Sequence, residues 1–377
     1  MDLERSAERD AFRAEARAWL EAHVPDPPPP SLETAEGFAA HRAWEAELHA
    51  GRWSVVSWPE RYGGRGVDLV GWLAFEEEYY AAGAPGRVAQ NGIHLLAPTL
   101  FDHGTPEQRE RILPPMASGL TIWAQAWSEP EAGSDLASLR SRAVRADGGW
   151  LLHGHKTWSS RAAFADRAFG LFRTDPEARR HEGLTYLMFD LRAPGVTVRP
   201  VGRLDGRPAF AEVVLDGVFV PDEDVIGAPG DGWRIAMSAT GHERGLLLRS
   251  PGRFLAAADR LVRLWRERGE DRGLRDRVAD AVIGARAYQL FTLAHATAPE
   301  GMPAGAASLN KLFWSRYDIA LHETALELLG PDGEFADTAW AEGYTFALAG
   351  PIYAGTNEIQ RDIVAERLLG LPRGGRR

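Results

Sequence analysis

The chain has 377 residues and no cysteine, and its formal net charge at pH 7 is −10. This length indicates two or three domains, and the negative charge argues against nucleic acids or anionic membranes as partners, because both require a basic surface. The missing cysteines exclude disulfides, thiolate metal ligands and cysteine nucleophiles, and nothing else in the chain predicts a metal site.

The basic residues are almost all arginine, since Lys156 and Lys311 are the only two lysines. The first ten residues are charged and lack the apolar stretch of a signal peptide. No uninterrupted apolar run is long enough to cross a bilayer. We therefore expect a cytoplasmic protein that binds neither membranes nor nucleic acids.

The chain begins with helical patterns. Phe12, Ala16 and Leu20 recur at helical spacing, and the proline run at residues 27–30 predicts a stiff linker. A second helix is predicted to start at Asp68. A third begins at Thr105-Pro106-Glu107-Gln108, which has the capping-box pattern with proline at the first helical position, and Pro114 is expected to end it.

From about residue 120 to residue 230 the spacing of apolar residues shortens from that of helices to that of β-strands. Asp147-Gly148-Gly149 is typical of a hairpin turn between strands at residues 143–146 and 150–154. Further strand-like runs follow at residues 184–191, 196–201 and 212–220. Short strands separated by turns predict a small antiparallel barrel or sandwich.

Helical patterns return after Asp231, at residues 233–268, 274–298, 304–329 and 356–369, and Gly330 is a predicted C-cap. Four long patterns predict an antiparallel helical bundle. The whole order predicts an α+β protein with an N-terminal helical domain at residues 1–119, a middle β domain at 120–230 and a C-terminal four-helix bundle at 231–377. No Gly-x-Gly-x-x-Gly follows a predicted strand, so the Rossmann fold has no support.

Three segments have residue types suited to ligand binding. Residues 123–135 combine polar side chains with a glycine-containing turn whose amides can donate to an anionic or carbonyl-rich ligand. At residues 156–160 a tryptophan stands beside small hydroxyl residues, which can stack on an aromatic cofactor and bond its edge. Residues 350–361 predict a capped helix N-terminus, which can hold a phosphate or hydroxyl. Each segment also has a purely structural interpretation, as a loop, a core tryptophan and an ordinary cap.

Taken together, the runs Ser-Glu-Pro-x-Ala-Gly-Ser-Asp, Lys-x-Trp-x-Ser and Tyr-x-Gly-Thr-Asn-Glu-Ile-Gln-Arg resemble the three signature segments of the acyl-CoA dehydrogenase family. Residues 57–64, 193–196 and 220–221 agree with that family as well. The resemblance runs from about residue 13 to residue 372, and the helix–strand–helix order is the family's fold. It implies FAD-dependent α,β-dehydrogenation of an acyl-CoA by a homodimer or homotetramer, with an electron-transfer flavoprotein as electron acceptor.

The resemblance implies flavin contacts in the middle domain. Gln125, Trp127 and Ser128 would contact the isoalloxazine ring. Trp158 would flank the ring, and Ser160 would bond its N5/O4 edge.

In the C-terminal domain, Thr356 and Glu358 would contact the adenosine half of FAD. Glu327 and Gly330 occupy the place of another FAD-contacting segment, which a neighbouring subunit often supplies. The chain departs from the family at Glu327, where many members have glutamine. It also lacks the Arg-x-x-Phe-Gly segment near residues 255–270 with which many members hold the pyrophosphate.

The reaction requires a carboxylate that removes the proton alpha to the thioester carbonyl while the beta hydrogen leaves as hydride. Many members place that glutamate where this chain has Ala354, which keeps the backbone N–H but lacks the side-chain base. The resemblance implies that this N–H and a flavin ribityl hydroxyl would polarise the carbonyl. Isovaleryl-CoA-dehydrogenase-like members instead use the glutamate of a Glu-Arg pair, and Glu243-Arg244 matches this pair. Glu243 is the predicted base, Arg244 and Ser134 are predicted substrate contacts, and His242 is an alternative base.

Other interpretations stay open. Glu243 can also be a surface residue paired with Arg244. The same fold includes oxidases, flavin monooxygenases and dehydrogenases of carrier-protein thioesters, and Ala354 permits a non-catalytic partner subunit of a mixed tetramer. The acyl group is not determined: steroid side chains, branched acids and aromatic acids are all compatible. His94 lies in a region that lines the acyl pocket in relatives, where it can contact a functionalised acyl group or be a structural histidine.

Overall fold

The computed structural model describes residues 6–244, 250–298, 305–334 and 338–372. The chain divides into two compact units that do not follow the order of the sequence. The helical unit combines residues 1–24, 67–84 and 244–377, and the sheet unit combines residues 25–66 and 85–243. The predicted arrangement of helices, then strands, then helices is confirmed, although the first helices are shared between the two units. The predicted boundaries of the three domains stay a prediction.

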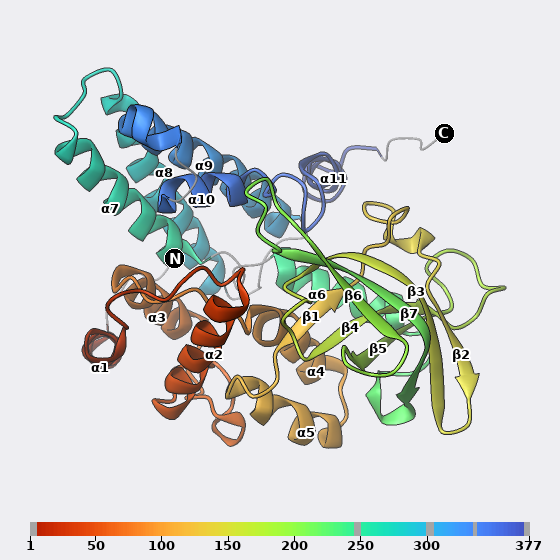
Figure 1. Cartoon of the computed structure of the whole chain (residues 1–377). Helices are drawn as coiled ribbons and strands as arrows, with labels where there is room; N and C mark the ends of the chain where they lie inside the picture. The colour runs from red at the N-terminus through yellow and green to blue at the C-terminus, as the bar shows by residue number, and fades with distance from the viewer. Residues whose placement is uncertain (1–5, 245–249, 299–304, 335–337, 373–377) are drawn as a thin grey trace. The chain divides into compact units, whose positions relative to one another are not determined.

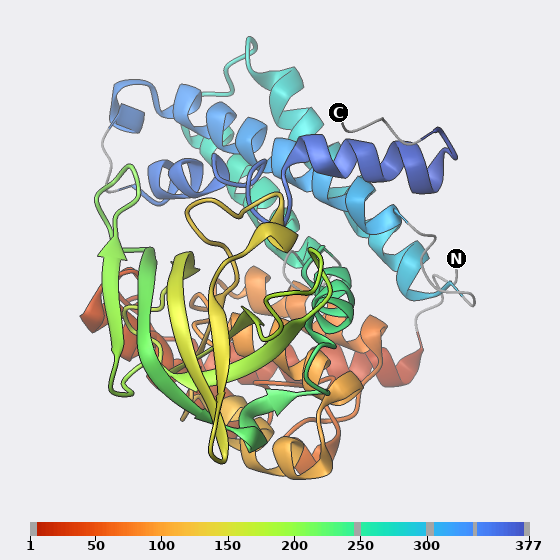
Figure 2. The ribbon, with the colours of Figure 1, turned by 90° about the vertical axis from the view of Figure 1, so that its right-hand side faces the viewer.

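The sheet unit is built on a sheet with the strand order β6-β7-β3-β2-β4-β5-β8, and β1 pairs in parallel with β4 (Figures 1 and 2). Within the described residues its strands are β1 (Trp123–Ala126), β2 (Arg142–Ala146), β3 (Gly149–Ser160), β4 (Arg167–Arg173), β5 (Leu184–Asp190), β6 (Val196–Val201), β7 (Phe210–Pro221) and β8 (Val225–Ile226). The pairs along the sheet are antiparallel except where β2 touches β4.

The predicted hairpin is confirmed, because β2 and β3 pair on either side of Gly148, whose φ is 68°. The predicted runs at residues 184–191, 196–201 and 212–220 correspond to β5, β6 and β7. The sequence pattern did not reveal β1, β4 and β8. Five consecutive residues of β4 are buried, so this strand lacks the alternation by which a half-buried strand is recognised.

Helices accompany the sheet in the same unit. They are α2 (Ala35–Ala50), α4 (Ala97–His103), α5 (Pro106–Ala117) and α6 (Gly232–Arg244, counted with this unit as far as Glu243), with a π-helical turn at Gly92–Leu96 before α4. The capping box of α5 is confirmed by reciprocal bonds between Thr105 and Gln108. The prediction that Pro114 ends α5 is wrong. Helix α5 continues to Ala117, because Pro114 and its neighbour lie in the last turn, where the Pro114 carbonyl still accepts from the Ser118 N–H at 3.2 Å.

Buried polar contacts fasten α5 to the sheet. The Gln108 side chain on α5 donates to the Val225 carbonyl at 2.6 Å. The carboxylate of Asp224 accepts from Arg111 of α5 at 2.7 Å and from Arg167 of β4 at 2.6 Å. Because Asp224 is itself buried, this pairing holds α5 firmly against the start of β4.

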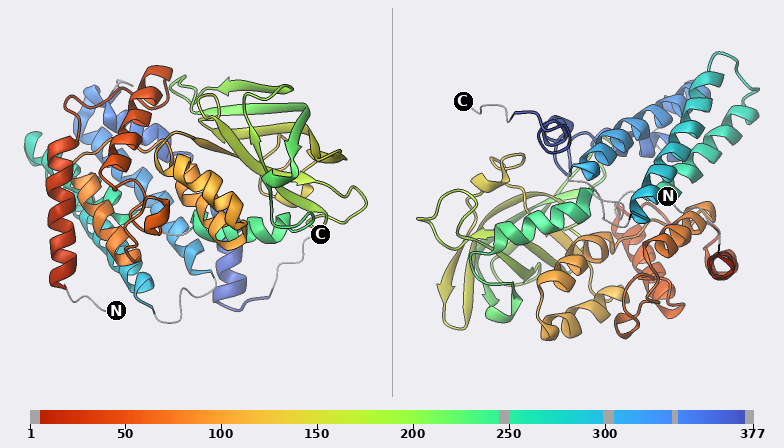
Figure 3. Two further views of the ribbon diagram at one scale, coloured as in Figure 1. Left: turned by 90° about the horizontal axis from the view of Figure 1, so that it is seen from below. Right: turned by 180° about the vertical axis from the view of Figure 1, so that it is seen from behind.

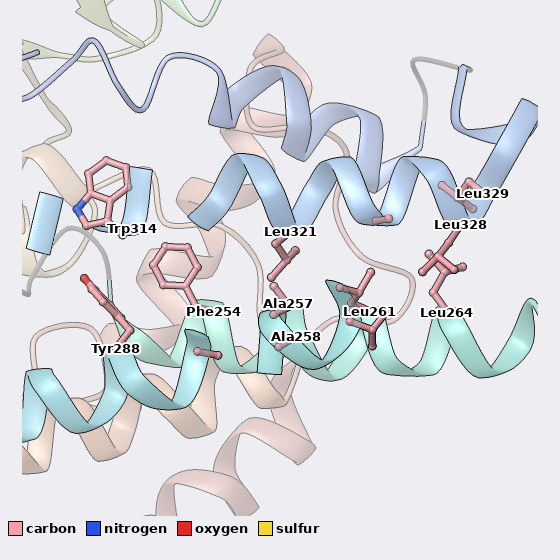
Figure 4. Packing of buried hydrophobic residues seen from close by; sticks show 14 residues of the cluster. Phe254, Ala257, Ala258, Leu261, Leu264, Tyr288, Trp314, Leu321, Leu328 and Leu329 are labelled. Carbon is pink, nitrogen blue, oxygen red and sulfur yellow. The ribbon is translucent and has the colours of Figure 1, made fainter. Parts of the chain in front are cut away.

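The helical unit contains α1 (Ala7–His23), α3 (Leu69–Ala81), α7 (Pro251–Glu267), α8 (Arg275–Ala296), α9 (Ala306–Leu329), α10 (Ala339–Ala347) and α11 (Asn357–Ile363), which continues as a π-helical turn to Leu368 (Figures 1 and 3). The predicted start of α3 is confirmed by its cap Asp68, and α1 begins after the cap Ser6. The helices α7, α8 and α9 share one apolar core in which Phe254, Tyr288 and Trp314 are buried (Figure 4). No helix among the described residues is long and apolar enough to span a bilayer.

The prediction of one continuous helix over residues 233–268 is wrong. Helix α6 ends at Arg244, and α7 begins at Pro251 with Ser250 as its N-cap, whose side chain accepts from the Gly252 N–H at 3.2 Å. Proline has no N–H to donate and therefore suits the first position of a new helix. The two helices also belong to different units.

Helices α1 and α3 from the start of the chain join α7 in the helical unit. On α3, Glu78 pairs with Arg13 at 3.0 Å and with Arg17 at 2.9 Å, both on α1. At the start of α7, a Cβ at Gly252 would lie 2.5 Å from the carbonyl oxygen of Glu76 and 2.8 Å from the amide nitrogen of Glu77. The close approach of α7 to α3 thus depends on a residue without a side chain.

We expect Gly252→Ala to lower the free energy of unfolding by about 2 kcal/mol, because the added methyl group forces apart two helix backbones. Urea unfolding followed by circular dichroism measures this. Gly133→Ala is the control, because a Cβ at Gly133 meets nothing within 4 Å. Equal urea midpoints for the two variants would contradict the close packing of α3 and α7.

Candidate functional site

Two of the three signature segments lie side by side in the sheet unit. Gln125 is on β1 opposite Phe169 of β4, and the chain leaves the sheet after Ala126 into the loop that carries Trp127 and Ser128. The Ser128 carbonyl accepts from the Thr157 N–H at 2.9 Å. The structure therefore brings the segment at residues 125–128 next to the segment at residues 156–160, as a shared ligand site requires.

Trp158 stands on a β-bulge. The register between β3 and β7 shifts between Lys156 and Ser159, and Trp158 has a φ of 58°. A left-handed backbone is uncommon for a bulky residue and costs about 1–3 kcal/mol, so the surrounding structure must impose it. The indole is 60% exposed and touches the edge of Phe210 at a ring-centroid distance of 5.8 Å. The bulge thus presents a large aromatic side chain to the outside of the sheet unit.

Two buried polar atoms in these two segments lack partners. Within the described part of the chain, neither Trp127 Nε1 nor Ser159 Oγ has a hydrogen-bond partner. The Trp127 ring is held edge-on against Tyr186 at 6.1 Å. A buried N–H or O–H without a partner is costly, and a bound ligand with acceptor atoms would remove that cost. An exposed indole and unsatisfied polar groups in the same two segments fit an aromatic ligand with hydrogen-bonding edges, as the flavin of FAD has.

The structure also identifies two residues beneath this site to which the sequence assigned no role. Lys156 is fully buried, and its ammonium donates to the Glu129 carboxylate at 2.8 Å. The sequence contained one signal for it, because Lys156 is one of only two lysines in an arginine-rich chain.

Ser134 lies in the exposed part of the loop that connects β1 to β2. This loop is tied to the β4–β5 connection, since Asp135 pairs with Arg180 at 2.6 Å and Arg173 donates to the carbonyls of Ala137 and Arg180. Ser134 is thus accessible to a ligand, on a loop that two arginines support.

The third signature segment belongs to the helical unit. The Thr356 hydroxyl caps α11 by accepting from the Ile359 N–H at 3.3 Å, which confirms the predicted N-cap. Glu358 is exposed in the first turn and pairs with Arg361 at 3.3 Å. Hydrogen bonding to the backbone at the helix start, with help from Thr356 and Arg361, holds the pKa of Glu358 below its usual value.

The turn before α11 is left-handed at two successive residues, Ala354 with a φ of 54° and Gly355 with a φ of 81°. The carbonyl of Ala354 accepts from the side chain of Gln360 at 3.3 Å. Asn357 is buried, and its amide oxygen accepts from Lys311 at 2.7 Å and from Ser315 at 3.1 Å, both on α9. The sequence did not reveal this anchor, which fixes the start of α11 against α9.

The remaining predicted site residues have simpler surroundings. Glu327 lies near the end of α9 and forms an ion pair with Arg277 of α8. Gly330 caps α9 with a φ of 59°, which confirms the predicted C-cap. Glu243 and Arg244 end α6, and their side chains, like that of His242, lie outside the described residues.

His94 is buried in the π-helical turn at Gly92–Leu96. Burial, with a smaller contribution from the charge of Arg87, lowers the pKa of His94 to about 3. The imidazole is therefore neutral at physiological pH. This state suits a hydrogen-bonding or structural role better than that of a cation.

Comparison with known proteins covers nearly the whole chain. Family models described as the N-terminal, middle and C-terminal domains of acyl-CoA dehydrogenase match residues 6–120, 124–218 and 230–369. The acyl-CoA dehydrogenase IpdE1 of Mycobacterium tuberculosis is 39% identical over 380 residues, which cover 97% of this chain and 98% of the relative.

Two solved structures of similar fold are assemblies of two named proteins. The Tcur3481-Tcur3483 steroid ACAD has a TM-score of 0.86 at 28% identity, covering 99% of this chain and 100% of that one. The ChsE4-ChsE5 complex from Mycobacterium tuberculosis has a TM-score of 0.83 at 28% identity, with the same coverage of both chains. With its three matching domains and its signature segments in place, the chain belongs to the acyl-CoA dehydrogenase family.

Proposed function

We propose that this acyl-CoA dehydrogenase holds FAD with its three signature segments and removes the α proton of an acyl thioester with Glu243. The observation that carries the proposal is the strained bulge at Trp158, which presents an exposed indole, together with the buried, unpartnered Trp127 Nε1 and Ser159 Oγ of the same two segments. In this proposal Gln125, Ser128 and Ser160 contact the flavin with these residues.

The helical unit supplies the other contacts. Thr356 and Glu358 at the start of α11 hold the adenosine half of FAD with their side chains, at the end of the helix where its dipole is positive. Glu327 and Gly330 at the end of α9 form a further contact segment. The N–H of Ala354, in the left-handed turn, donates to the thioester carbonyl and stabilises the enolate charge that develops there.

Side chains of the protein carry out proton removal and substrate binding. The carboxylate of Glu243 takes the proton alpha to the carbonyl, while Ser134 and Arg244 hold the thioester arm. Bound FAD would supply the acceptor for the β hydrogen, which leaves as hydride. The indole of Trp158 covers the flavin and keeps water from the reacting atoms.

For the acyl group we propose a steroid-derived thioester, because the Tcur3481-Tcur3483 assembly, which is similar to this chain over nearly its whole length, is a steroid ACAD. The test is an anaerobic titration of the purified yellow protein with a panel of straight-chain, branched, aromatic and steroid side-chain acyl-CoAs. Bleaching of the flavin absorbance by the steroid thioester supports both the reaction and the class. Bleaching by a straight-chain thioester alone contradicts the class, and no bleaching by any member contradicts the reaction.

The electron acceptor is tested in the same assay. We propose an electron-transfer flavoprotein, so the bleached enzyme should recover its absorbance quickly with that protein and slowly with oxygen. Rapid recovery in air would indicate an oxidase.

A second candidate function is that of one subunit in a mixed assembly. Two observations favour it: Ala354 stands where many relatives have the catalytic glutamate, and two similar structures carry two protein names each. Native mass spectrometry of the purified chain with one equivalent of FAD distinguishes the candidates. A homodimer or homotetramer with full FAD occupancy and bleaching supports the self-sufficient enzyme, and a colourless chain that turns yellow only with a partner supports the mixed assembly.

Replacing Trp158 should separate backbone strain from ligand binding. Trp158→Ala and Trp158→Gly both remove the indole, so we expect both to weaken FAD binding about tenfold or more. Glycine adopts a φ of 58° without strain, so the glycine variant should be more stable than the alanine variant by about 1 kcal/mol. Fluorescence titration with FAD and urea unfolding of the apoprotein measure the two effects, and wild-type FAD affinity in either variant would remove Trp158 from the site.

A further inference from the structure

The buried ammonium of Lys156 lies between the two signature segments of the sheet unit. Its three N–H donors have three acceptors: the Glu129 carboxylate at 2.8 Å, the Leu171 carbonyl of β4 at 2.8 Å and the Trp127 carbonyl at 3.4 Å. It also lies 4.8 Å from the centre of the Phe172 ring. Each donor therefore fastens the cation to a different part of the unit, and one of these parts is the backbone of Trp127.

Glu129 completes the arrangement from the loop side. One carboxylate oxygen accepts from Lys156 and from the Ser141 N–H at 2.9 Å, and the other accepts from the Arg140 N–H at 2.6 Å. Burial raises the pKa of Glu129, but Lys156 and the Arg140 N–H more than offset this, so its pKa lies below the usual value. The carboxylate is thus ionised at neutral pH and joins both ends of the loop at residues 127–141 to β3.

The connection continues directly to the bulge. Thr157, the residue after Lys156, donates its N–H to the Ser128 carbonyl at 2.9 Å, and the next residue is Trp158. Residues 127 and 128 are thus each held through a carbonyl by consecutive residues of β3. A shift of Lys156 would change the spacing between Trp127 and Trp158.

Lysine suits this position better than arginine. An arginine would bring five donors in a planar fork, two more than the three acceptors found around Lys156, and each unpaired buried donor is costly. The chain uses lysine only twice, and both lysines are fully buried, Lys156 as the first residue of one signature segment and Lys311 beneath Asn357 of another.

We infer that Lys156 and Glu129 are positioning residues that set the distance and orientation of Trp127 and Ser128 relative to Trp158 and thereby shape the flavin-binding surface. This inference rests on the proposed function. Neither residue touches the reacting atoms. Both act through the backbone that carries the ligand contacts, as outer-shell residues do at metal sites.

The test compares FAD affinity with stability of the apoprotein. We expect Glu129→Gln to weaken FAD binding by about tenfold to hundredfold, as loss of an outer-shell partner does elsewhere. The matched control is Glu45→Gln, because Glu45 is a buried carboxylate that likewise accepts from a basic side chain, Arg87 at 2.7 Å, and from a backbone N–H, that of Ala89 at 3.0 Å. The control should lower the urea midpoint similarly and leave FAD affinity unchanged.

A double variant keeps the inference testable if the single variant folds poorly. Glu129→Leu with Lys156→Met replaces the ion pair by apolar side chains, which can restore stability. FAD affinity should stay about tenfold or more below wild type even where the urea midpoint recovers. A double variant that regains both would show that the pair has only a structural role and would overturn the inference.

Amine labelling provides an independent readout. Because the chain has two lysines, reductive methylation followed by mass spectrometry reports on Lys156 individually. We expect Lys156 to be protected in the wild-type holoprotein and labelled at least several times faster in Glu129→Gln. Equal labelling rates and equal FAD affinities would overturn the inference while leaving the proposed function intact, whereas a wild-type chain that takes up no FAD alone or with a partner would overturn both.

Discussion

Glu243→Gln should lower the rate of flavin reduction by an acyl-CoA substrate by about 10²- to 10⁴-fold, the usual contribution of a general base. Glutamine has nearly the size of glutamate but cannot take up the α proton. The variant should still be yellow and bind FAD with wild-type affinity, because no cofactor contact is assigned to Glu243. Stopped-flow absorbance under anaerobic conditions measures the effect, and an unchanged reduction rate would exclude Glu243 as the base.

A glutamate in place of Ala354 should partly restore the reduction rate that Glu243→Gln loses. Many members of the family carry their glutamate there, so Glu243→Gln combined with Ala354→Glu should regain part of the lost rate, about tenfold or more, with the carboxylate approaching from the other position. Ala354 already has a left-handed backbone with a φ of 54°, so a glutamate brings no new backbone strain of that kind. A double variant as slow as Glu243→Gln would show that a carboxylate at residue 354 cannot reach the α proton.

Asn357→Leu should lower the free energy of unfolding by about 2–3 kcal/mol, because it leaves the buried Lys311 ammonium and the Ser315 hydroxyl without their shared acceptor. The same change should weaken FAD binding, since Asn357 fixes the start of α11 between Thr356 and Glu358. Asn357→Asp keeps the acceptor and should retain wild-type stability.

Asn310 is the matched control for this prediction. It lies on α9 next to Lys311 and is equally buried, but neither atom of its amide finds a hydrogen-bond partner within the described ranges. Asn310→Leu should therefore be neutral or stabilising, because it removes unpaired buried polar atoms. Urea unfolding of both variants measures the contrast, and a similar loss in each would mean that the bonds to Asn357 contribute nothing beyond packing.

Local signals account for the elements that could be predicted from the sequence. The helix starts at Asp68 and Thr105 depend on a side chain that bonds an N–H three residues away, so a short stretch contains the whole interaction. The turn at Gly148 likewise depends on adjacent residues that tolerate a left-handed backbone. The three signature segments were recognised for the same reason, as short runs of residues in a fixed order.

Elements that depend on residues far away in the chain were either not predicted or predicted with the wrong bounds. The strand β1 has only four residues and depends on its pairing with β4. Because β4 is buried along its length, it lacks the alternation of apolar and polar residues that would have revealed β4 as a strand. The break between α6 and α7 coincides with the boundary between the two units, which the helical pattern over residues 233–268 does not show.

Pro114 was expected to end α5, but a proline in a last turn removes few hydrogen bonds, and the helix continues.

The candidate site likewise combines features that short stretches of sequence predict with features that depend on distant residues. The sequence by itself determined the family, the residue types of the three segments and the cap that starts α11, because these depend on neighbours within a few positions. Only the tertiary structure decided that the Thr157 N–H donates to the Ser128 carbonyl, that Trp158 stands on a left-handed bulge, and that both lysines are buried. The physical reason is that burial, strand register and the pairing of a buried charge depend on groups far apart in the chain, which come together only when it folds.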